Sequence, residues 1–279
     1  MVCGCCGFAG MPGGNSGPSH MSAALLRRLL AHPLTTGMEL DDPATTERRK
    51  LIIASKPFLK AIYEEWYTLL ASALPSGEGA VLELGSGAGF GDRYIRDLIT
   101  SEVFECSWVQ LVVDAAHIPF EAGSLRAIVF TDVLHHFSDV RLFFREATRC
   151  LRSGGKILMI EPWVTPWSRF VFKHFHHEPF RPEAEDWSFP STGPLSGANG
   201  AIPWMVFVKD FGKFKQEFPD LEIEKIRPFL PFRYLVSGGV SMRSLMPGFT
   251  HPLWVRLERM LESQMSRLAM FAFVSVRRR

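Results

Sequence analysis

The chain has 279 residues, of which 47% are hydrophobic and 22% charged, and its formal net charge is +2. A chain of this length can bury the large core of one enzyme-sized domain that carries additions. The nearly balanced charge gives no case for a nucleic-acid-binding surface, which needs concentrated basic side chains. We therefore expect no nucleic-acid partner.

Residues 1–20 are rich in Gly, Pro and Ser and show no hydrophobic periodicity, which predicts disorder. They contain Cys3, Cys5 and Cys6, but a zinc site needs four ligands at a workable spacing, so no metal is expected there. The segment lacks the charged start and apolar run of a signal peptide, and we expect a cytoplasmic protein. Met21 is a candidate for the natural start.

Residues 21–76 are expected to form N-terminal helices. Helical patterns between residues 45 and 74 are interrupted at Pro57, and proline suits the first turn of a helix. After Pro57, apolar residues recur on one side of the helix and predict a face that packs on a sheet. Tyr63 and Tyr67 could also face a ligand.

An apolar run that starts at Val81 ends in the glycine-rich turn Gly85-Ser-Gly-Ala-Gly89. The pattern indicates a buried strand and a loop whose backbone can approach a ligand closely, because glycine has no Cβ. We expect a helix over residues 91–99, with its N-terminal N–H groups directed at the ligand. The glycine spacing alone does not identify that ligand.

Further apolar runs each end in polar residues. They are residues 109–113, followed by Asp114; residues 127–130, followed by Thr131 and Asp132; and residues 156–160, followed by Glu161. In an open parallel sheet, ligands bind at the carboxyl ends of the strands. These polar residues should therefore converge with the glycine turn and His136 on one crevice.

Ordered motifs occupy Glu83 to Gly89, Asp114 to Phe120, Val133 to His136 and Ser153 to Leu158. Together they resemble the class I S-adenosylmethionine-dependent methyltransferases of the methyltransferase-11 type, in which E-L-G-x-G-x-G, D-A-x-x-[IL]-P-F, V-L-H-H and P-G-G-x-[IL] follow in this order. The resemblance covers about residues 80–163, and Ser153 stands where that family usually has proline.

The resemblance implies an α/β fold: a Rossmann-like, doubly wound, seven-stranded and mostly parallel sheet with an antiparallel last strand. To this are added the N-terminal helices and a lid of helices and loops. Apolar residues at helical spacing over 140–151 predict a βαβ crossover, and residues 221–227 and 268–276 are expected to form the terminal antiparallel pair.

The resemblance also implies S-adenosyl-L-methionine as the cofactor. An acidic residue that ends the second strand would accept hydrogen bonds from the ribose; Glu102 is the candidate and Glu105 the alternative. Asp114 and the N–H of Ala115 would hold the adenine edge. The other expected cofactor-binding residues are Glu83, Gly85, Ser86, Gly87, Gly89, Thr131 and Asp132.

Residues 77–279 are expected to form the methyltransferase domain, with lid insertions at about 163–215 and 228–264. The first insertion is dense in aromatic side chains, which suit a partly apolar acceptor or form a core of their own. Residues 252–265 could lie on a membrane surface as an amphipathic helix, although a packed surface helix is more common. No run is long enough to span a bilayer.

We expect methyl transfer to an oxygen or nitrogen of a small, partly apolar metabolite: a lipid, an isoprenoid, a polyketide-like compound or a saccharide-linked molecule. His136 and His135 are the candidate bases, since histidine titrates near neutral pH. His174, His176 and His177 with Glu178 have a metal-like composition, but no metal is predicted.

Two other functions remain open at this point. The first is a methyltransferase-like module that binds the cofactor without transferring a methyl group and acts as an assembly or regulatory partner. The second is a nicotinamide-dependent oxidoreductase, against which the motifs at Asp114 and His136 argue.

Overall fold

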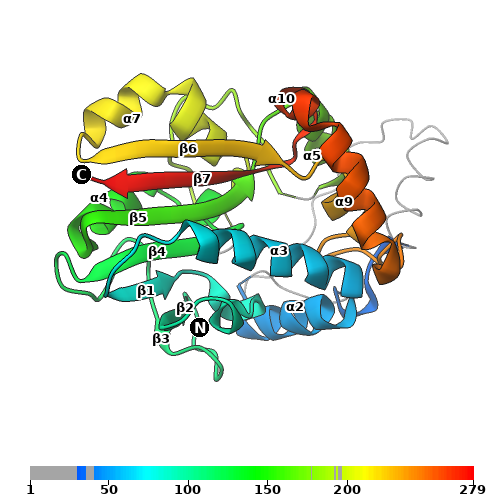
Figure 1. The fold of residues 1–279 in the computed structure, drawn as a ribbon, viewed down its shortest axis with the longest axis horizontal. Helices are drawn as coiled ribbons and strands as arrows, with labels where there is room; N and C mark the ends of the chain where they lie inside the picture. The colour runs from blue at the N-terminus through cyan, green and yellow to red at the C-terminus, as the bar shows by residue number, and fades with distance from the viewer. Residues whose placement is uncertain (1–29, 36–40, 177, 192, 194–196) are drawn as a thin grey trace, which may run out of the picture.

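The computed structural model describes residues 30–35, 41–176, 178–191, 193 and 197–279. The disorder expected for residues 1–20, the three cysteines in them and the candidate start at Met21 lie outside this range. A twisted sheet runs through the middle of the described chain, and helices cover both of its faces (Figure 1).

The sheet confirms the predicted α/β class. Its strands are β1 (Ala80–Glu83), β2 (Leu98–Glu102), β3 (Leu111–Val112), β4 (Leu125–Thr131), β5 (Leu151–Pro162), β6 (Leu221–Phe229) and β7 (Phe271–Arg278). They lie in the order β3-β2-β1-β4-β5-β7-β6. The pairs from β3 to β5 are parallel, and β7 is antiparallel to both of its neighbours.

The helices connect and cover these strands. They are α2 (Pro43–Ser55), α3 (Pro57–Ala73), α4 (Val140–Cys150), α5 (Pro166–Phe175), α6 (Ile202–Trp204), α7 (Phe211–Glu217), α8 (Arg233–Ser237), α9 (His251–Met260) and α10 (Met265–Leu268). Single turns include η2 (Ser86–Ala88), η3 (Gly91–Arg93) and η4 (Leu134–His136).

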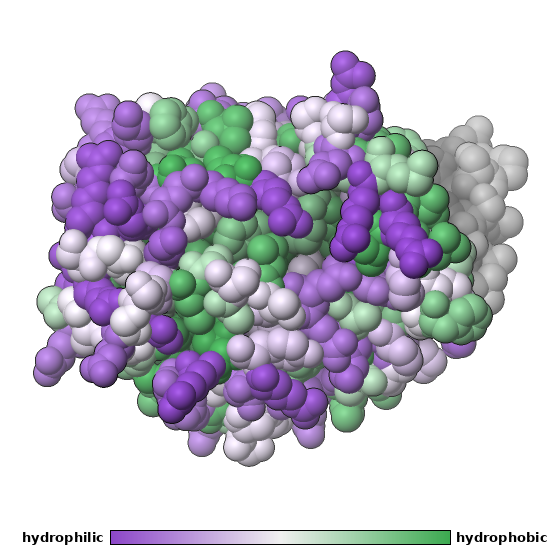
Figure 2. Space-filling view, viewed as in Figure 1, coloured by the Kyte–Doolittle hydropathy of each residue, from purple (hydrophilic) through white to green (hydrophobic). Residues whose placement is uncertain are grey.

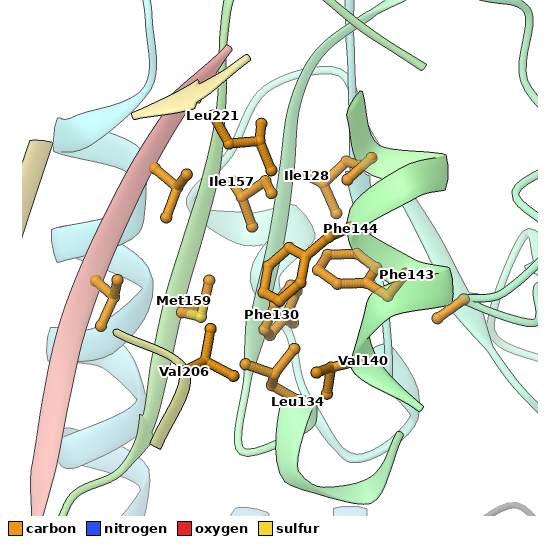
Figure 3. Close-up of a cluster of buried hydrophobic side chains, with 14 of the residues drawn as sticks. Ile128, Phe130, Leu134, Val140, Phe143, Phe144, Ile157, Met159, Val206 and Leu221 are labelled. Atoms are coloured by element: carbon orange, nitrogen blue, oxygen red, sulfur yellow. The ribbon is translucent and has the colours of Figure 1, made fainter. Parts of the chain in front are cut away.

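A buried core lies on each face of the sheet. On one face, Phe143 and Phe144 of α4 point toward Phe130 of β4 and Met159 of β5 (Figure 3). On the other face, the apolar stripe of α3 packs on β1 and β4, as its sequence predicts. Strands covered on both faces need continuous apolar runs, which β4 and β5 supply.

The helix predicted over residues 91–99 is wrong. Only the short turn η3 forms, and β2 starts at Leu98, which pairs with Val81 of β1. Too few residues separate Gly89 from this strand for a helix and its connections. Asp97, with a φ of 59°, turns the chain directly into β2.

The insertions are packed by polar anchors as well as by aromatic rings. Trp187 is fully buried, and its Nε1 donates a hydrogen bond of 2.8 Å to Asp210. In the second insertion, Nε of the buried Arg233 donates to Oε2 of Glu258 over 2.6 Å. Arg233 also pairs with Glu65, so these side chains fasten α8 and α9 to α3.

Helix α9 lies where an amphipathic helix was predicted, and several of its apolar side chains point outward. The exposed ones are Leu253, Leu257 and Met260. Hydrophilic and hydrophobic residues are mixed across the face that carries α9 (Figure 2). Within the described ranges, no helix is both long and apolar enough to cross a bilayer, and peripheral membrane contact stays a prediction.

Candidate functional site

A cavity of about 650 Å³ lies at the carboxyl ends of the parallel strands. Its lining includes most of the residues expected from the sequence: Gly85, Gly89, Glu102, Asp114, Ala115, Thr131, Asp132 and His136. It does not include Glu83, Ser86, Gly87, His135 or Glu161, all of which were expected there. The polar residues that end separate strands are therefore brought to one place, as parallel topology requires.

The glycine turn is closely packed by the N-terminal helices. A Cβ at Gly87 would lie 2.2 Å from Thr46 of α2, and one at Gly89 would lie 1.9 Å from the hydroxyl of Tyr67 of α3. Gly85 has a φ of 67°, which favours glycine. The glycines thus allow α2 and α3 to cover the turn, in addition to any approach by a ligand.

Glu102 ends β2 and holds the turn after β1. Its Oε2 accepts a hydrogen bond of 3.1 Å from the nitrogen of Gly87, and its Oε1 accepts one of 2.8 Å from Val103. Burial raises the pKa of this carboxyl, although the two hydrogen bonds oppose the shift. Glu102 lines the cavity, whereas the exposed Glu105 does not.

Glu83 lies beneath the glycine turn. Burial raises the pKa of its carboxyl to about 7, against the effect of hydrogen bonds from the hydroxyls of Ser86 and Tyr67. Among the described residues, its Oε2 has no hydrogen-bond partner. Ser86 ties the turn to β2, because its hydroxyl accepts a bond of 3.1 Å from the nitrogen of Ser101.

Asp114 and Ala115 follow β3 at the edge of the sheet. Oδ1 of Asp114 accepts a hydrogen bond of 2.9 Å from the nitrogen of Ala116, and Oδ2 lies 3.3 Å from Nδ1 of His117. The side chain of Asp114 is 63% exposed, so it keeps access to a ligand as well as to solvent.

The carboxylates near the glycine turn and at the end of β3 suit S-adenosylmethionine. Glu102 and Asp114 supply carboxylates, and Oε2 of the neighbouring Glu83 has no hydrogen-bond partner among the described residues. Such acceptors suit a ligand that carries an ammonium, a sulfonium, ribose hydroxyls and an adenine amine. Of the expected residues, Ser86 and Gly87 shape the turn rather than line the cavity.

A cluster of histidines and carboxylates follows β4. Nδ1 of His135 lies 2.8 Å from Oε2 of Glu161, and its Nε2 lies 3.4 Å from Oε2 of Glu178. Oε1 of Glu161 accepts hydrogen bonds of 2.7 and 2.8 Å from the nitrogens of Val133 and Leu134. His135 is therefore held on both sides, while Glu161 is fixed by the backbone of η4.

The pKa values of the groups in and beside this cluster are shifted in different directions. Burial opposes the charged form of His135, but hydrogen bonds to Glu161 and Glu178 outweigh it and raise its pKa well above the usual value. Burial and the neighbouring His135 lower the pKa of His136 to about 3. Burial, reinforced by Glu161 and Glu178, raises the pKa of Asp132 to about 7.

Asp132 carries backbone strain at the end of β4. Its φ is 62°, a conformation uncommon for residues other than glycine, and its N–H donates a hydrogen bond of 2.8 Å to Ile160. Strain of this kind gathers at functional sites, where the surrounding structure enforces it. Here it turns the carboxylate toward the cavity.

The other half of the cavity is largely apolar. Phe172 and Phe175 of α5, Tyr234 of α8 and Tyr63 of α3 line it, whereas Tyr67 of α3 lines the cavity beside the glycine turn. Tyr63 and Tyr67 were expected either to pack on the sheet or to face a ligand. In the structure they do both, since they belong to the core and also line the cavity. Other rings of the first insertion join the core on one face of the sheet, as those of Trp163, Trp187 and Phe207 do.

Residues 238–242 also line the cavity. They lie within the insertion expected at about 228–264, but sequence reasoning singled out none of them. The buried ammonium of Lys56 donates hydrogen bonds to the carbonyls of Gly239 and Met242, the second over 2.7 Å. Burial lowers the pKa of Lys56 to about 8. The Gly238-Gly239 pair was the one available signal, because both glycines have positive φ.

Comparisons with known proteins find solved structures that are similar to this chain. Geranyl diphosphate C-methyltransferase from Streptomyces coelicolor A3(2) is similar in structure, at 14% identity over 95% of this chain and 100% of that one, with a TM-score of 0.46. An S-adenosylmethionine dependent methyltransferase from Mesorhizobium loti is also similar, at 15% identity over 75% of this chain and 96% of that one, with a TM-score of 0.46.

No curated protein matches the chain. A family model does match, over residues 82–159, and it describes a methyltransferase domain of the methyltransferase-11 type. The matched region runs from β1 to β5 and includes the glycine turn, Glu102, Asp114 and the two histidines of the cluster. Residues 82–159 are thus similar to a methyltransferase domain of the methyltransferase-11 type.

Proposed function

We propose that the chain is an enzyme that transfers the methyl group of S-adenosylmethionine to an oxygen or nitrogen atom of a small, partly apolar molecule. One observation supports this above the others. A single cavity joins a half edged by carboxylates and the glycine turn to a half walled by aromatic rings. A polar cofactor and an apolar acceptor would meet where the two halves join, beside Asp132.

On the cofactor side, each expected residue has a proposed role that its position supports. The backbone from Gly85 to Gly89 would face the amino-acid part of the cofactor, and Glu102 would accept hydrogen bonds from the ribose. Asp114 and the N–H of Ala115 would hold the adenine edge. Thr131 would border the same part of the cavity as Asp132.

On the acceptor side, the walls favour a molecule with an apolar body and one polar group. Rings of Phe172, Phe175 and Tyr234 would contact the body. The polar group would face Asp132 and the neighbouring His136. Ligand pockets usually have volumes of about 300–1,000 Å³, and this cavity lies within that range. The acceptor, a lipid fragment, an isoprenoid or a polyketide-like compound, would share it with the cofactor.

The chemical step needs in-line approach of the acceptor atom to the methyl group in a site that excludes water. S-adenosylmethionine, held by the glycine turn, Glu102 and Asp114, would supply an electrophilic methyl group. A lone pair of the acceptor would form the new bond to carbon, and the electron pair of the broken carbon–sulfur bond would go to sulfur. For a hydroxyl acceptor, the proton leaves to the carboxylate of Asp132. Both nitrogens of His135 already face Glu161 and Glu178, so this ring is poorly placed to take it.

Calorimetry would test the proposal, with S-adenosylmethionine, S-adenosylhomocysteine, NAD and NADP titrated separately into wild type and Asp114→Ala. We expect micromolar binding of the two adenosyl ligands alone, about −8 kcal/mol, weakened by the substitution. Absence of adenosyl binding would sink the proposal. Binding without turnover across a screen of apolar hydroxyl and amine acceptors would instead support the non-catalytic module.

A further inference from the structure

Potential metal ligands gather on the acceptor side of the cavity. Nitrogens of His135 and His136 and a carboxylate oxygen of Glu178 all lie within 4.8 Å of one another. The histidines come from η4, after β4, whereas Glu178 comes from the first insertion. The fold therefore joins two distant segments at this point, and His136 and Glu178 both line the cavity.

The spacing of these atoms suits a small divalent ion. An ion with tetrahedral bonds of about 2.0–2.2 Å holds neighbouring ligand atoms roughly 3.3–3.6 Å apart. Oε2 of Glu178 lies 3.4 Å from Nε2 of His135, and its Oε1 lies 3.9 Å from Nε2 of His136. One ligand atom from each of the three residues lies within 4.8 Å of the others, so side-chain movements of about 1 Å would bring the three groups onto one ion.

The surroundings of His135 have the arrangement typical of a metal-ligating histidine. Such a histidine usually donates its second ring nitrogen to a carboxylate, which fixes the ring and leaves the other nitrogen for the ion. Nδ1 of His135 donates to Glu161 over 2.8 Å, and Glu161 is itself fixed by hydrogen bonds from Val133 and Leu134. Nε2 is thereby aimed at Glu178 and the cavity.

We propose that His135, His136 and Glu178 bind a divalent transition-metal ion such as Zn²⁺, with one coordination position open toward the acceptor. Two imidazoles and a carboxylate suit Zn²⁺ and its neighbours better than Mg²⁺ or Ca²⁺, which prefer oxygen ligands. The role of this ion rests on the proposed function: it would act as a Lewis acid on the acceptor oxygen and orient it. Glu161 is then a positioning residue.

The site can be tested without any acceptor. The full chain, stripped with a chelator, is titrated with Zn²⁺ alone by calorimetry, and Co²⁺ absorption reports the coordination geometry. The variants are Glu178→Gln and His136→Gln, with folding checked by circular dichroism. Glu178→Gln keeps the shape of a side chain that is 15% exposed, so it tests the site even if His136→Gln fails to fold.

His174→Gln is the matched control, because His174 is an exposed histidine at the end of α5 and is not among the three ligands. We expect one Zn²⁺ per chain, at least 10-fold weaker binding in Glu178→Gln, and no change in the control. Equal binding in wild type and Glu178→Gln, or loss in His174→Gln, would overturn the proposal in favour of an adventitious surface site. Absence of stoichiometric binding would overturn it too, leaving the cluster as an ion-paired network.

S-adenosylhomocysteine titrated into the zinc-free chain separates this proposal from the proposed function. If S-adenosylhomocysteine does not bind, the proposed methyltransferase function is overturned, but the result of the zinc titration is unaffected. Conversely, an intact cofactor site without zinc binding would overturn only the metal proposal.

Discussion

The carboxylate of Glu102, the last residue of β2, accepts a hydrogen bond of 3.1 Å from the backbone nitrogen of Gly87 in the turn after β1. One side chain thus sets the shape of the glycine turn and also lines the cavity beside it. A change at Glu102 should therefore affect the ligand in two ways, through the turn and through direct contact.

Glu102→Gln is expected to weaken the binding of S-adenosylhomocysteine by about 10- to 100-fold, because a hydrogen bond to a charged group contributes about 1.5–3 kcal/mol. Calorimetry measures the change. Glu105→Gln is the control, since Glu105 is exposed and does not line the cavity. Equal losses in both variants would contradict the assignment of the ribose to Glu102.

Phe175→Ala should raise the KM for the acceptor several-fold and leave cofactor affinity unchanged. Phe175 lines the apolar half of the cavity but is 47% exposed, so its truncation costs little stability. Phe211→Ala is the matched control, because Phe211 is 45% exposed and lies outside the cavity. Steady-state kinetics would show the idea to be wrong if both variants behaved alike.

Asp132→Asn is expected to lower turnover by about 10²- to 10⁴-fold, the usual contribution of general acid–base catalysis. Asparagine tolerates positive φ, so the backbone at the end of β4 should be preserved. S-adenosylhomocysteine affinity, measured in parallel, should stay within about twofold. A large loss of that affinity would return Asp132 to the cofactor-binding role that the family resemblance implies.

The sheet could be predicted from the sequence because its buried strands are continuous apolar runs that stop at polar residues, as at Thr131 and Glu161. The segment from Leu98 to Glu102 gave no such signal. It becomes a strand because Leu98 pairs with Val81 of β1, and no local sequence pattern predicts that contact. A helix was therefore predicted across its start. At such positions, pairing with a neighbouring strand decides the secondary structure, whatever the local sequence pattern favours.

Some residues of the candidate site could be predicted from the sequence and others could not. Residues of the cofactor half follow strands in ordered motifs, so their convergence could be expected. Glu178 and Tyr234 reach the cavity from the insertions, and only the packing of those insertions decides where they lie. No periodicity in the sequence sets Glu178 beside His135.

Glu83 should make stability depend on pH. The pKa of its carboxyl is about 7 in the folded chain, against the ordinary glutamate value of 4.5, so the folded state keeps a proton that the unfolded state loses between these values. The free energy of unfolding should therefore fall as pH rises from about 4.5 to 7, by up to about 3 kcal/mol. Above pH 7 this contribution should be constant.

Urea unfolding of wild type and Glu83→Gln at pH 5 and pH 8 would check this. The fall between the two pH values should be smaller in the variant, because glutamine does not titrate. Glu121→Gln, at an exposed position, serves as the control. Identical falls in wild type and Glu83→Gln would rule the effect out.

Glu258→Ala should destabilise the chain by about 3–5 kcal/mol, because it leaves the buried guanidinium of Arg233 without its closest partner. Thermal unfolding followed by circular dichroism gives the change. Glu262→Ala, at an exposed position after α9, should stay within about 0.5 kcal/mol of wild type. A small effect of Glu258→Ala would mean that Glu65 alone compensates Arg233.

The hydrogen bond from Lys56 to Gly239 joins residues 183 positions apart. During synthesis, the glycine turn leaves the ribosome long before the loop that completes the acceptor half of the cavity. Contacts of such long range form late, since the chain between their ends must first be closed. Competence to hold an acceptor should thus be the last property that a newly made chain acquires, later than the formation of the parallel strands.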